Sequence, residues 1–386
     1  MSSPDTDAPP ITVFGATGVV GRRLCAELLR TGTAIAIAGR RAAALAELAA
    51  TLPAARVHVA DAGDAAALAR AFAGTRVVVN AAGPLRETAA PVLMGALAAG
   101  AHYVDVGGEQ AVLHAVYEHH ESAARHAGKV ALPGAGLDCT IGDLAAAWAA
   151  AHLLGLPGTN DPGGAVRGEP APRLAEADPL DDIAVSYVFD DLALSAGTQR
   201  ALFGAVGTRP LVWRRDRWEA GAAGEHHRIN AGPALGGERD AQVFAGGDVL
   251  TIPRHVTARL VTTYVSTTRR AGPATALRLL ARTLLLLPRS ARELLVPYAT
   301  PDAALAHTRF AVVVQVRRGF STAQIVVRGH DLYRTTAAIT AWSACRLAER
   351  GSGPIGMRAP GELFRAEPAL RAIASAADLT IEPSFG

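Results

Sequence analysis

The sequence predicts a doubly wound α/β domain over residues 11–152, followed by a second, mixed α+β domain over residues 153–330. Three observations support this. Short apolar strands alternate with alanine-rich helical segments before residue 150, a loop with three glycines follows the first strand, and longer strand-like runs appear after residue 152. Continuous apolar strands separated by helices are typical of a parallel sheet that helices cover on both faces.

The elements of the first domain follow one another at regular intervals. Helices are expected over residues 20–29 and 42–50, and further helical segments separate the later strands. The predicted strands are, in chain order, ITVFG, AIAIAG, RVHVA, RVVVNAAG, HYVDVGG and KVALPG.

The second domain begins with the Gly- and Pro-rich stretch LPGTNDPGGAVRGEPAPRLAEADPL, which predicts a loop. SAGTQRALFGAV predicts a helix capped by Ser195 or Thr198, and a Leu- and Arg-rich helix is expected after Gly272. The predicted strands are DIAVSYVF, RPLVWRR, DVLTIPRHV, LVTTYVS and an antiparallel hairpin of TRFAVVVQVRR and TAQIVVRG joined by GFS. Residues 331–386 are expected to form a helical segment that packs back on the first domain, and residues 1–10 a polar, disordered tail.

Composition and charge exclude several function classes. The net charge is +3 and the pI about 9.0, but no dense Lys/Arg run with interleaved aromatic residues is present, which argues against nucleic-acid binding. The three cysteines are far apart and form no metal-binding or disulfide pattern. His119, His120 and Glu121 lie in a polar helix without metal-ligand spacing, so no metal site is expected.

We expect a cytoplasmic protein, because the N-terminus has no apolar signal segment and no stretch is long and apolar enough to span a membrane. The longest apolar stretch, residues 274–296, is interrupted by four arginines and a proline. It is compatible with core packing, a border of an apolar substrate channel, peripheral membrane contact or a dimer interface.

The stretch VFGATGVVG, residues 13–21, places Gly15, Gly18 and Gly21 directly after the first strand. Glycines at this spacing, at the start of the first helix of a strand–helix–strand unit, allow a tight turn and close approach of backbone N–H groups to a pyrophosphate. The sequence therefore predicts a Rossmann-type dinucleotide site, to which the Thr17 hydroxyl adds a phosphate contact.

The end of the second strand indicates which dinucleotide binds. An NAD site usually has an acidic residue there, whereas this chain has Gly39, Arg40 and Arg41. Two guanidinium groups suit a 2′-phosphate, so we expect NADP(H) as the cofactor, the alternative being two solvated arginines at a helix start. Asp61 is expected near the adenine. The segment after the fourth strand is expected near the middle of the cofactor and its nicotinamide, with Asn80 also interpretable as a turn-former; it comprises Asn80, Ala81, Ala82 and Gly83.

Lys129 is the only lysine of the chain, and Arg125 stands four residues before it. The Tyr-x-x-x-Lys pair of short-chain dehydrogenases is therefore absent. Any proton donor must be a tyrosine, histidine, cysteine, carboxyl group or water.

Five segments, in order, resemble the saccharopine dehydrogenase-like oxidoreductases: GATGVVGRRL, AGR, VVNAAGP, AGAHYVDVGGE and PGAGLDCTIGDL. This superfamily includes saccharopine reductases and trans-acting enoyl reductases. The segments SAGTQRALFG, GGDVLTIPRH and GHDLY…TTAAITAW are similar to the enoyl reductase branch. The chain lacks the lysine-based groups of saccharopine-forming enzymes, which argues against saccharopine itself as the product.

The resemblance implies a dinucleotide domain completed by the C-terminal segment, and a second domain whose sheet covers the active-site cleft and supports a homodimer. It also implies that the cofactor positions include Gly15, Thr17, Gly18, Val19, Val20, Gly21, Arg40, Asn80, Ala81 and Gly83.

Two residues are the candidates for catalysis. Asp138 follows the sixth strand and could orient a donor or a water, while Tyr103 in the fifth strand could protonate a nitrogen or carbon. Their structural alternatives are a helix cap for Asp138 and a half-buried strand position for Tyr103. Cys139 is interpreted as a packing residue, because hydride transfer needs no covalent step.

The sequence thus favours an NADPH-dependent reductase. It would deliver hydride to a C=N (imine) or activated C=C bond of a small or carrier-attached biosynthetic intermediate. A non-catalytic NADP(H)-binding sensor or interaction protein is the alternative hypothesis.

Overall fold

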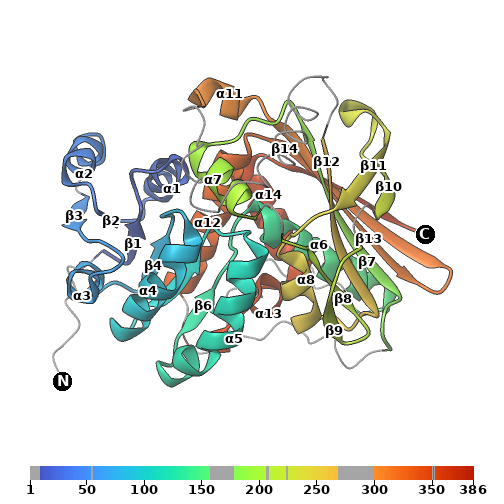
Figure 1. The fold of residues 1–386 in the computed structure, drawn as a ribbon, viewed down its shortest axis with the longest axis horizontal. Coiled ribbons are helices and arrows are strands. Elements are labelled where there is room, and N and C mark those ends of the chain that lie inside the picture. The colour runs from blue at the N-terminus through green and yellow to red at the C-terminus, as the bar shows by residue number, and fades with distance from the viewer. Residues whose placement is uncertain are drawn as a thin grey trace.

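The computed structural model describes residues 9–53, 55–156, 178–205, 208–222, 225–267, 300–349, 351 and 353–386. Two sheets lie side by side, with the helices α6 (Leu137–Leu153), α12 (Leu332–Ala348) and α14 (Ala366–Ala377) between them (Figure 1). Most of the predicted loop between the domains and the Leu- and Arg-rich helix lie outside the described residues, as does nearly all of the N-terminal tail.

The first sheet has seven strands, all parallel, in the order β15-β6-β5-β4-β1-β2-β3. Its strand order reverses between β1 and β4, which is where a doubly wound sheet opens a crevice at the strands' carboxyl ends. The strands are β1 (Ile11–Phe14), β2 (Ile35–Gly39), β3 (Arg56–Val59), β4 (Val77–Asn80), β5 (His102–Asp105), β6 (Val130–Leu132) and β15 (Gly356–Met357).

Helices connect these strands. The continuous apolar character of β1, β2 and β4 follows from burial of every residue in them. The connecting helices are α1 (Val19–Arg30), α2 (Ala42–Ala49), α3 (Ala65–Phe72), α4 (Leu85–Ala98) and α5 (Gln110–His126). These elements confirm the predicted Rossmann-type arrangement.

The second sheet has nine strands and is mixed, as the fold class predicted. Strands β7 and β12 are parallel, whereas β13 and β14 form the predicted antiparallel hairpin. The strands are β7 (Asp182–Asp190), β8 (Leu211–Arg214), β9 (Arg217–Ala220), β10 (His226–Asn230), β11 (Glu238–Val243), β12 (Leu260–Thr267), β13 (Arg309–Arg318), β14 (Ser321–His330) and β16 (Thr380–Phe385).

Helix α6 joins the two halves into one core. A single buried hydrophobic cluster extends from Val13 in β1 through Leu144 in α6 to Val314 in β13. The sequence LAAAWAAA makes α6 narrow, because alanine side chains let neighbouring elements approach closely on every side. The N-terminal turn of this helix reaches the carboxyl edge of the parallel sheet, while its later turns lie under the mixed sheet.

The C-terminal segment contributes to both halves. The Arg23 guanidinium of α1 donates to the Asp331 carboxylate, the N-cap of α12, at 2.7 Å. Strand β15 extends the parallel sheet beside β6, and β16 pairs with β14 in the mixed sheet. The remaining helices are α7 (Ala196–Ala205), α8 (Asp248–Thr251), α11 (Asp302–Ala306) and α13 (Pro360–Leu363), with 3-10 turns at Pro233–Leu235 and Ile252–Arg254.

The prediction for DVLTIPRHV is wrong: this segment forms α8 and a 3-10 turn, not a strand. Its β-branched residues favour a strand locally, but the carboxyl group of Asp248 is fully buried and Pro253 removes a backbone donor. The sequence also missed β9, β10, β11 and β16, whose residues are mostly exposed and polar. The helix cap is confirmed as Ser195, whose hydroxyl accepts from the Thr198 N–H at 3.2 Å.

Candidate functional site

The glycine loop between β1 and α1 lies tightly against the turn that follows β4. Gly15 has a φ of +82°, and a Cβ added there would lie 2.5 Å from the Ala82 nitrogen. A Cβ at Gly21 would lie 2.3 Å from the Gly15 carbonyl oxygen. Neither position has room for a side chain, so loop, helix and turn approach one another through their backbones.

The first turn of α1 fits an anionic ligand. Gly18 caps the helix without a side-chain hydrogen bond, and the turn has no acidic residue. The N–H groups of Val19, Val20 and Gly21 therefore have no intrahelical acceptor, and the helix dipole is positive at this end. This donor set fits the pyrophosphate of a dinucleotide.

Arg40 and Arg41 follow β2 beside this loop, and both are exposed. Arg41 Nη2 donates to the Thr17 hydroxyl at 3.0 Å, which brings one guanidinium group directly to the glycine loop. Asp61 follows β3 and is exposed, with its carboxylate accepting from the Gly63 N–H at 2.9 Å. The structure thus brings the predicted phosphate and adenosine residues together at one end of the strand edge.

The turn after β4 is held by Asn80, which is fully buried. Its side-chain oxygen accepts from the Ala82 N–H at 3.0 Å, and its nitrogen donates to Thr88 and Tyr103 at 3.3 Å each. The Asn80 side chain therefore shapes the turn, while Ala81, Ala82 and Gly83 remain partly or fully exposed along it.

Tyr103 lies within the sheet and has no exposed surface. Its hydroxyl donates to Asp105 Oδ2 at 2.9 Å, and burial holds the pKa of the phenol well above its usual range. Asp105 also accepts from the N–H groups of Gly107 and Gly134, at 2.9 Å each. This network ties the loops after β5 and β6 together, and its burial argues against Tyr103 as a direct proton donor.

Asp138 stands in the first turn of α6 and is partly exposed. Its carboxyl group lies against Gly108, where an added Cβ would be 1.6 Å from Oδ2. Desolvation raises the pKa of Asp138 to about 6, and the carboxylates of Asp105 and Glu109 act in the same direction. A carboxyl group with this pKa, at the carboxyl edge of the sheet, can give or take a proton near neutrality.

Cys139 follows Asp138 and is buried. A Cβ at Gly247 would lie 2.3 Å from its sulfur, and burial raises the pKa of the thiol well above its usual range. These contacts fit a packing residue.

Sequence reasoning missed Gln110, which joins the two domains beside this corner. Its side-chain oxygen accepts from the Leu211 N–H at 2.7 Å, and its nitrogen donates to the carbonyls of Leu211 and Gly246 at 3.1 and 2.9 Å. Gln110 shares a helix face with Leu113 and Tyr117, three and seven residues later, which was the available signal for its burial.

Two further buried carboxyl groups were also missed. Asp143 of α6 lies 2.9 Å from His255 Nε2 and accepts from the Gly361 N–H. Asp248 accepts from the Tyr187 hydroxyl, and burial raises its pKa well above the usual range. Asp143 connects α6 to His255 and Gly361, and Asp248 connects α8 to β7, both deep in the core.

Within the described ranges, no cluster of His, Cys, Asp and Glu residues could hold a metal ion. A search of the same residues found no helix with the length and apolar character needed to cross a membrane.

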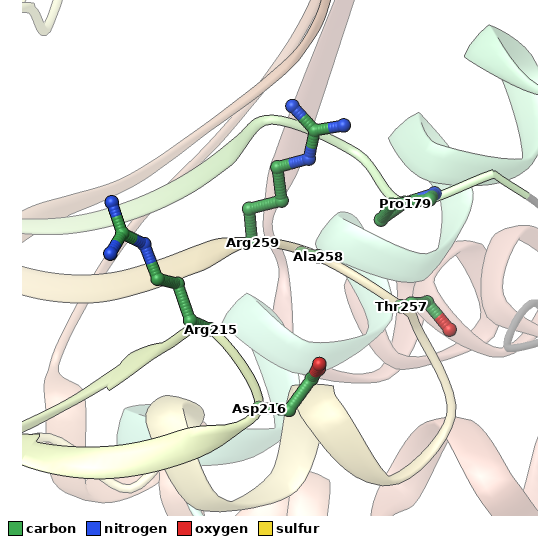
Figure 2. Close-up of a pocket in the computed structure, with 6 residues that line it drawn as sticks. All are labelled: Pro179, Arg215, Asp216, Thr257, Ala258 and Arg259. Carbon is green, nitrogen blue, oxygen red and sulfur yellow. The ribbon is translucent and has the colours of Figure 1, made fainter.

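The surface depression in Figure 2, of about 490 Å³, lies on the second domain. Figure 2 shows the Arg215 side chain extending from the turn after β8 and the Arg259 side chain from the residue before β12, and Arg259 forms an ion pair with Asp181 at 3.5 Å. None of the predicted cofactor or catalytic residues lines this depression, so it is separate from the site above. Its lining residues are Pro179, Arg215, Asp216, Thr257, Ala258 and Arg259.

Comparison with known proteins found similarity in sequence and in fold. The chain is 29% identical over 146 residues to a Caenorhabditis elegans protein named lipid droplet localized protein. The match covers 35% of this chain and 34% of the relative, so the chain spans about a third of the length of the curated relative it matches.

The fold also matches a solved structure, the apo histidine-tagged saccharopine dehydrogenase (L-Glu forming) from Saccharomyces cerevisiae. The TM-score is 0.63 at 14% identity, covering 98% of this chain and 100% of the other. Residues 11–132 match the family model of the saccharopine dehydrogenase NADP binding domain, so the first domain binds NADP(H). Residues 11–132 thus form a domain of the saccharopine dehydrogenase NADP binding family, and the whole chain shares the fold of that saccharopine dehydrogenase.

Proposed function

We propose that the protein is an NADPH-dependent reductase that delivers hydride to a C=N (imine) or activated C=C bond of a biosynthetic intermediate. The observation that carries this proposal is Asp138, a partly exposed residue at the strand edge whose carboxyl pKa is raised to about 6 by desolvation. A general acid works best when its pKa lies near the operating pH.

Different residues of the first domain bind different parts of the cofactor. The α1 N-terminus and Thr17 hold the pyrophosphate, Arg40 and Arg41 the 2′-phosphate, and Asp61 lies on the adenosine side. Bound NADPH supplies the hydride. The backbone of Ala81, Ala82 and Gly83 borders its path toward Asp138, and the small side chains leave room there.

Hydride transfer leaves one atom of the acceptor basic, a nitrogen or a carbon. Asp138 gives its proton to that atom. The sequence suggested Tyr103 as a proton donor, and we propose a different role for it. Its hydroxyl donates to Asp105, and Asp105 holds Gly107 and Gly134 on either side of the Asp138 corner. We therefore assign Tyr103 as a positioning residue.

The test is stopped-flow absorbance at the nicotinamide band, with panels of imines, enones and carrier-bound acceptors. We expect hydride loss from NADPH with at least one acceptor class. Asp138→Asn should slow that step at least tenfold and leave NADPH affinity unchanged. Absence of hydride transfer to every class would contradict the proposal.

The second candidate function is a non-catalytic NADP(H)-binding sensor or interaction protein. It is favoured by the burial of Tyr103 and by the name of the C. elegans relative, which records a location and no reaction. It predicts that Asp138→Ala with Tyr103→Phe leaves function in the cell intact. Loss of function in this double variant, with cofactor affinity unchanged, would eliminate it.

We further propose that the protein is a cytoplasmic homodimer, acting on a small or carrier-attached substrate, and able to make peripheral contact with a membrane. Analytical ultracentrifugation and vesicle flotation test the dimer and the membrane contact separately.

A further inference from the structure

Thr17 lies at the meeting point of two arginine side chains. Arg22, in the first turns of α1, donates from Nε to the Thr17 carbonyl oxygen at 3.2 Å. Arg41, from the end of β2, donates from Nη2 to the Thr17 hydroxyl at 3.0 Å. The backbone of Thr17 is thus held by the helix that follows it, while its hydroxyl accepts from a guanidinium group of another element.

The arginines around this loop carry uncompensated charge. In the described ranges, no carboxylate forms an ion pair with Arg22, Arg40 or Arg41, whereas Arg23 and Arg30 on the same helix are each paired. Exposed arginines lose side-chain entropy when they are fixed, so an arginine without a carboxylate partner needs another group to hold it. For Arg41 that group is the Thr17 hydroxyl.

We propose that Thr17 is a specificity-determining residue, because its hydroxyl positions Arg41 for the 2′-phosphate of NADP(H). This inference rests on the NADP(H) use in the proposed function and deepens it. The arrangement assigns different tasks to the two arginines after β2: Arg41 is preorganised by the loop, and Arg40 is not.

The chemistry of a hydroxyl group supports the assignment. A threonine hydroxyl has two lone pairs and one proton. Its lone pair accepts from Arg41, so its proton remains available to a pyrophosphate oxygen at the same loop. Thr17 thereby couples recognition of the two phosphate positions. Because the Arg41 side chain is already ordered, less side-chain entropy is lost when the cofactor binds.

The experiment is titration calorimetry of the full-length protein with NADP+ and with NAD+. Thr17→Val, which keeps the shape and removes the hydroxyl, should lower the affinity for NADP+ about tenfold more than the affinity for NAD+, since Arg41 then loses the group that positions it. Thr17→Ser should retain the preference of the wild type. Adenosine 2′,5′-bisphosphate and 5′-AMP, as shorter probes, should repeat the pattern.

Two double variants provide the matched controls. In an Arg41→Ala background, Thr17→Val should change the NADP+ preference by no more than about twofold, because the positioned group is already gone. In an Arg40→Ala background it should again reduce the preference about tenfold.

Equal loss of NADP+ and NAD+ affinity in Thr17→Val, or the same loss of preference with and without Arg41, would overturn the inference. Because these readouts involve no turnover, the inference stands or falls separately from the reductase activity. A protein that shows the coupling but transfers no hydride would contradict only the proposed function.

Discussion

The carboxyl group of Asp138 rests against the α-carbon of Gly108, so that a Cβ at position 108 would lie 1.6 Å from Oδ2. The residue proposed as the acid is therefore located by a residue with no side chain, in the loop after the neighbouring strand. A side chain at position 108 would force the Asp138 carboxyl group to shift from this place.

Gly108→Ala should displace the Asp138 carboxyl group and slow hydride transfer at least tenfold, because small misplacements of a reacting group are costly. NADP+ affinity should change by less than about threefold, since the pyrophosphate and 2′-phosphate contacts are elsewhere. Gly351→Ala is the matched control, because nothing lies within 4 Å of a Cβ added there. Equal rates for the two variants would remove Asp138 from the mechanism.

The pH dependence of the reaction should report Asp138. Since the reactive form is the protonated acid, kcat/KM should fall as pH rises above the pKa of about 6. Asp138→Asn should lack this limb. The pKa is raised from 3.8, so the folded state holds this proton more tightly than the unfolded state. The associated stabilisation is complete below pH 3.8 and is lost as pH rises to about 6.

The buried pair of Asp143 and His255 should contribute strongly to stability. Asp143→Ala leaves the imidazole and the Gly361 N–H without their acceptor, so we expect a loss of about 3–5 kcal/mol in free energy of unfolding. Urea unfolding measures this. Glu367→Ala, which breaks the exposed pair with Arg371, is the comparison and should cost at most about 1 kcal/mol. Similar losses in both variants would show that burial adds nothing here.

Gln110→Glu should weaken the connection between the two domains. The substitution keeps the shape but replaces the donor to the carbonyls of Leu211 and Gly246 with an acceptor, a loss of about 2 kcal/mol or more. At low pH the glutamate of this variant is protonated, and its O–H group then restores one hydrogen-bond donor. Thermal unfolding should therefore show a smaller difference from the wild type at pH 5 than at pH 8, and an unchanging difference would contradict this account.

The sequence predicted the parts of the fold that local pattern determines. Continuous apolar runs gave β1, β2 and β4, and the glycine spacing located the turn at Gly15. The exposed strands β9–β11 have no such pattern, because most of their residues are polar and face solvent, although β9 pairs with the adjacent β8 and β10 with the adjacent β11. For α8, burial of the Asp248 carboxyl group against Tyr187 outweighed local strand preference.

The sequence predicted the part of the site that the glycine loop forms. It predicted less well the residues whose role depends on whether they are buried. The contact of Arg41 with Thr17 follows from the strand order, because β1 and β2 are neighbours in the sheet. The sequence around Tyr103 does not show whether its hydroxyl faces Asp105 inside the sheet or faces solvent. That depends on which residues cover β5 in the folded protein. The contact of Gln110 with Leu211 joins residues a hundred positions apart and required the assembled structure.

Asp138 stands in the first turn of α6, and the later turns of the same helix pack under the mixed sheet. We therefore expect a change of packing volume at Val314, in the same buried cluster as Leu144, to shift the Asp138 carboxyl group without substituting any residue of the crevice. Directed changes of acceptor preference could therefore be sought far from the nicotinamide.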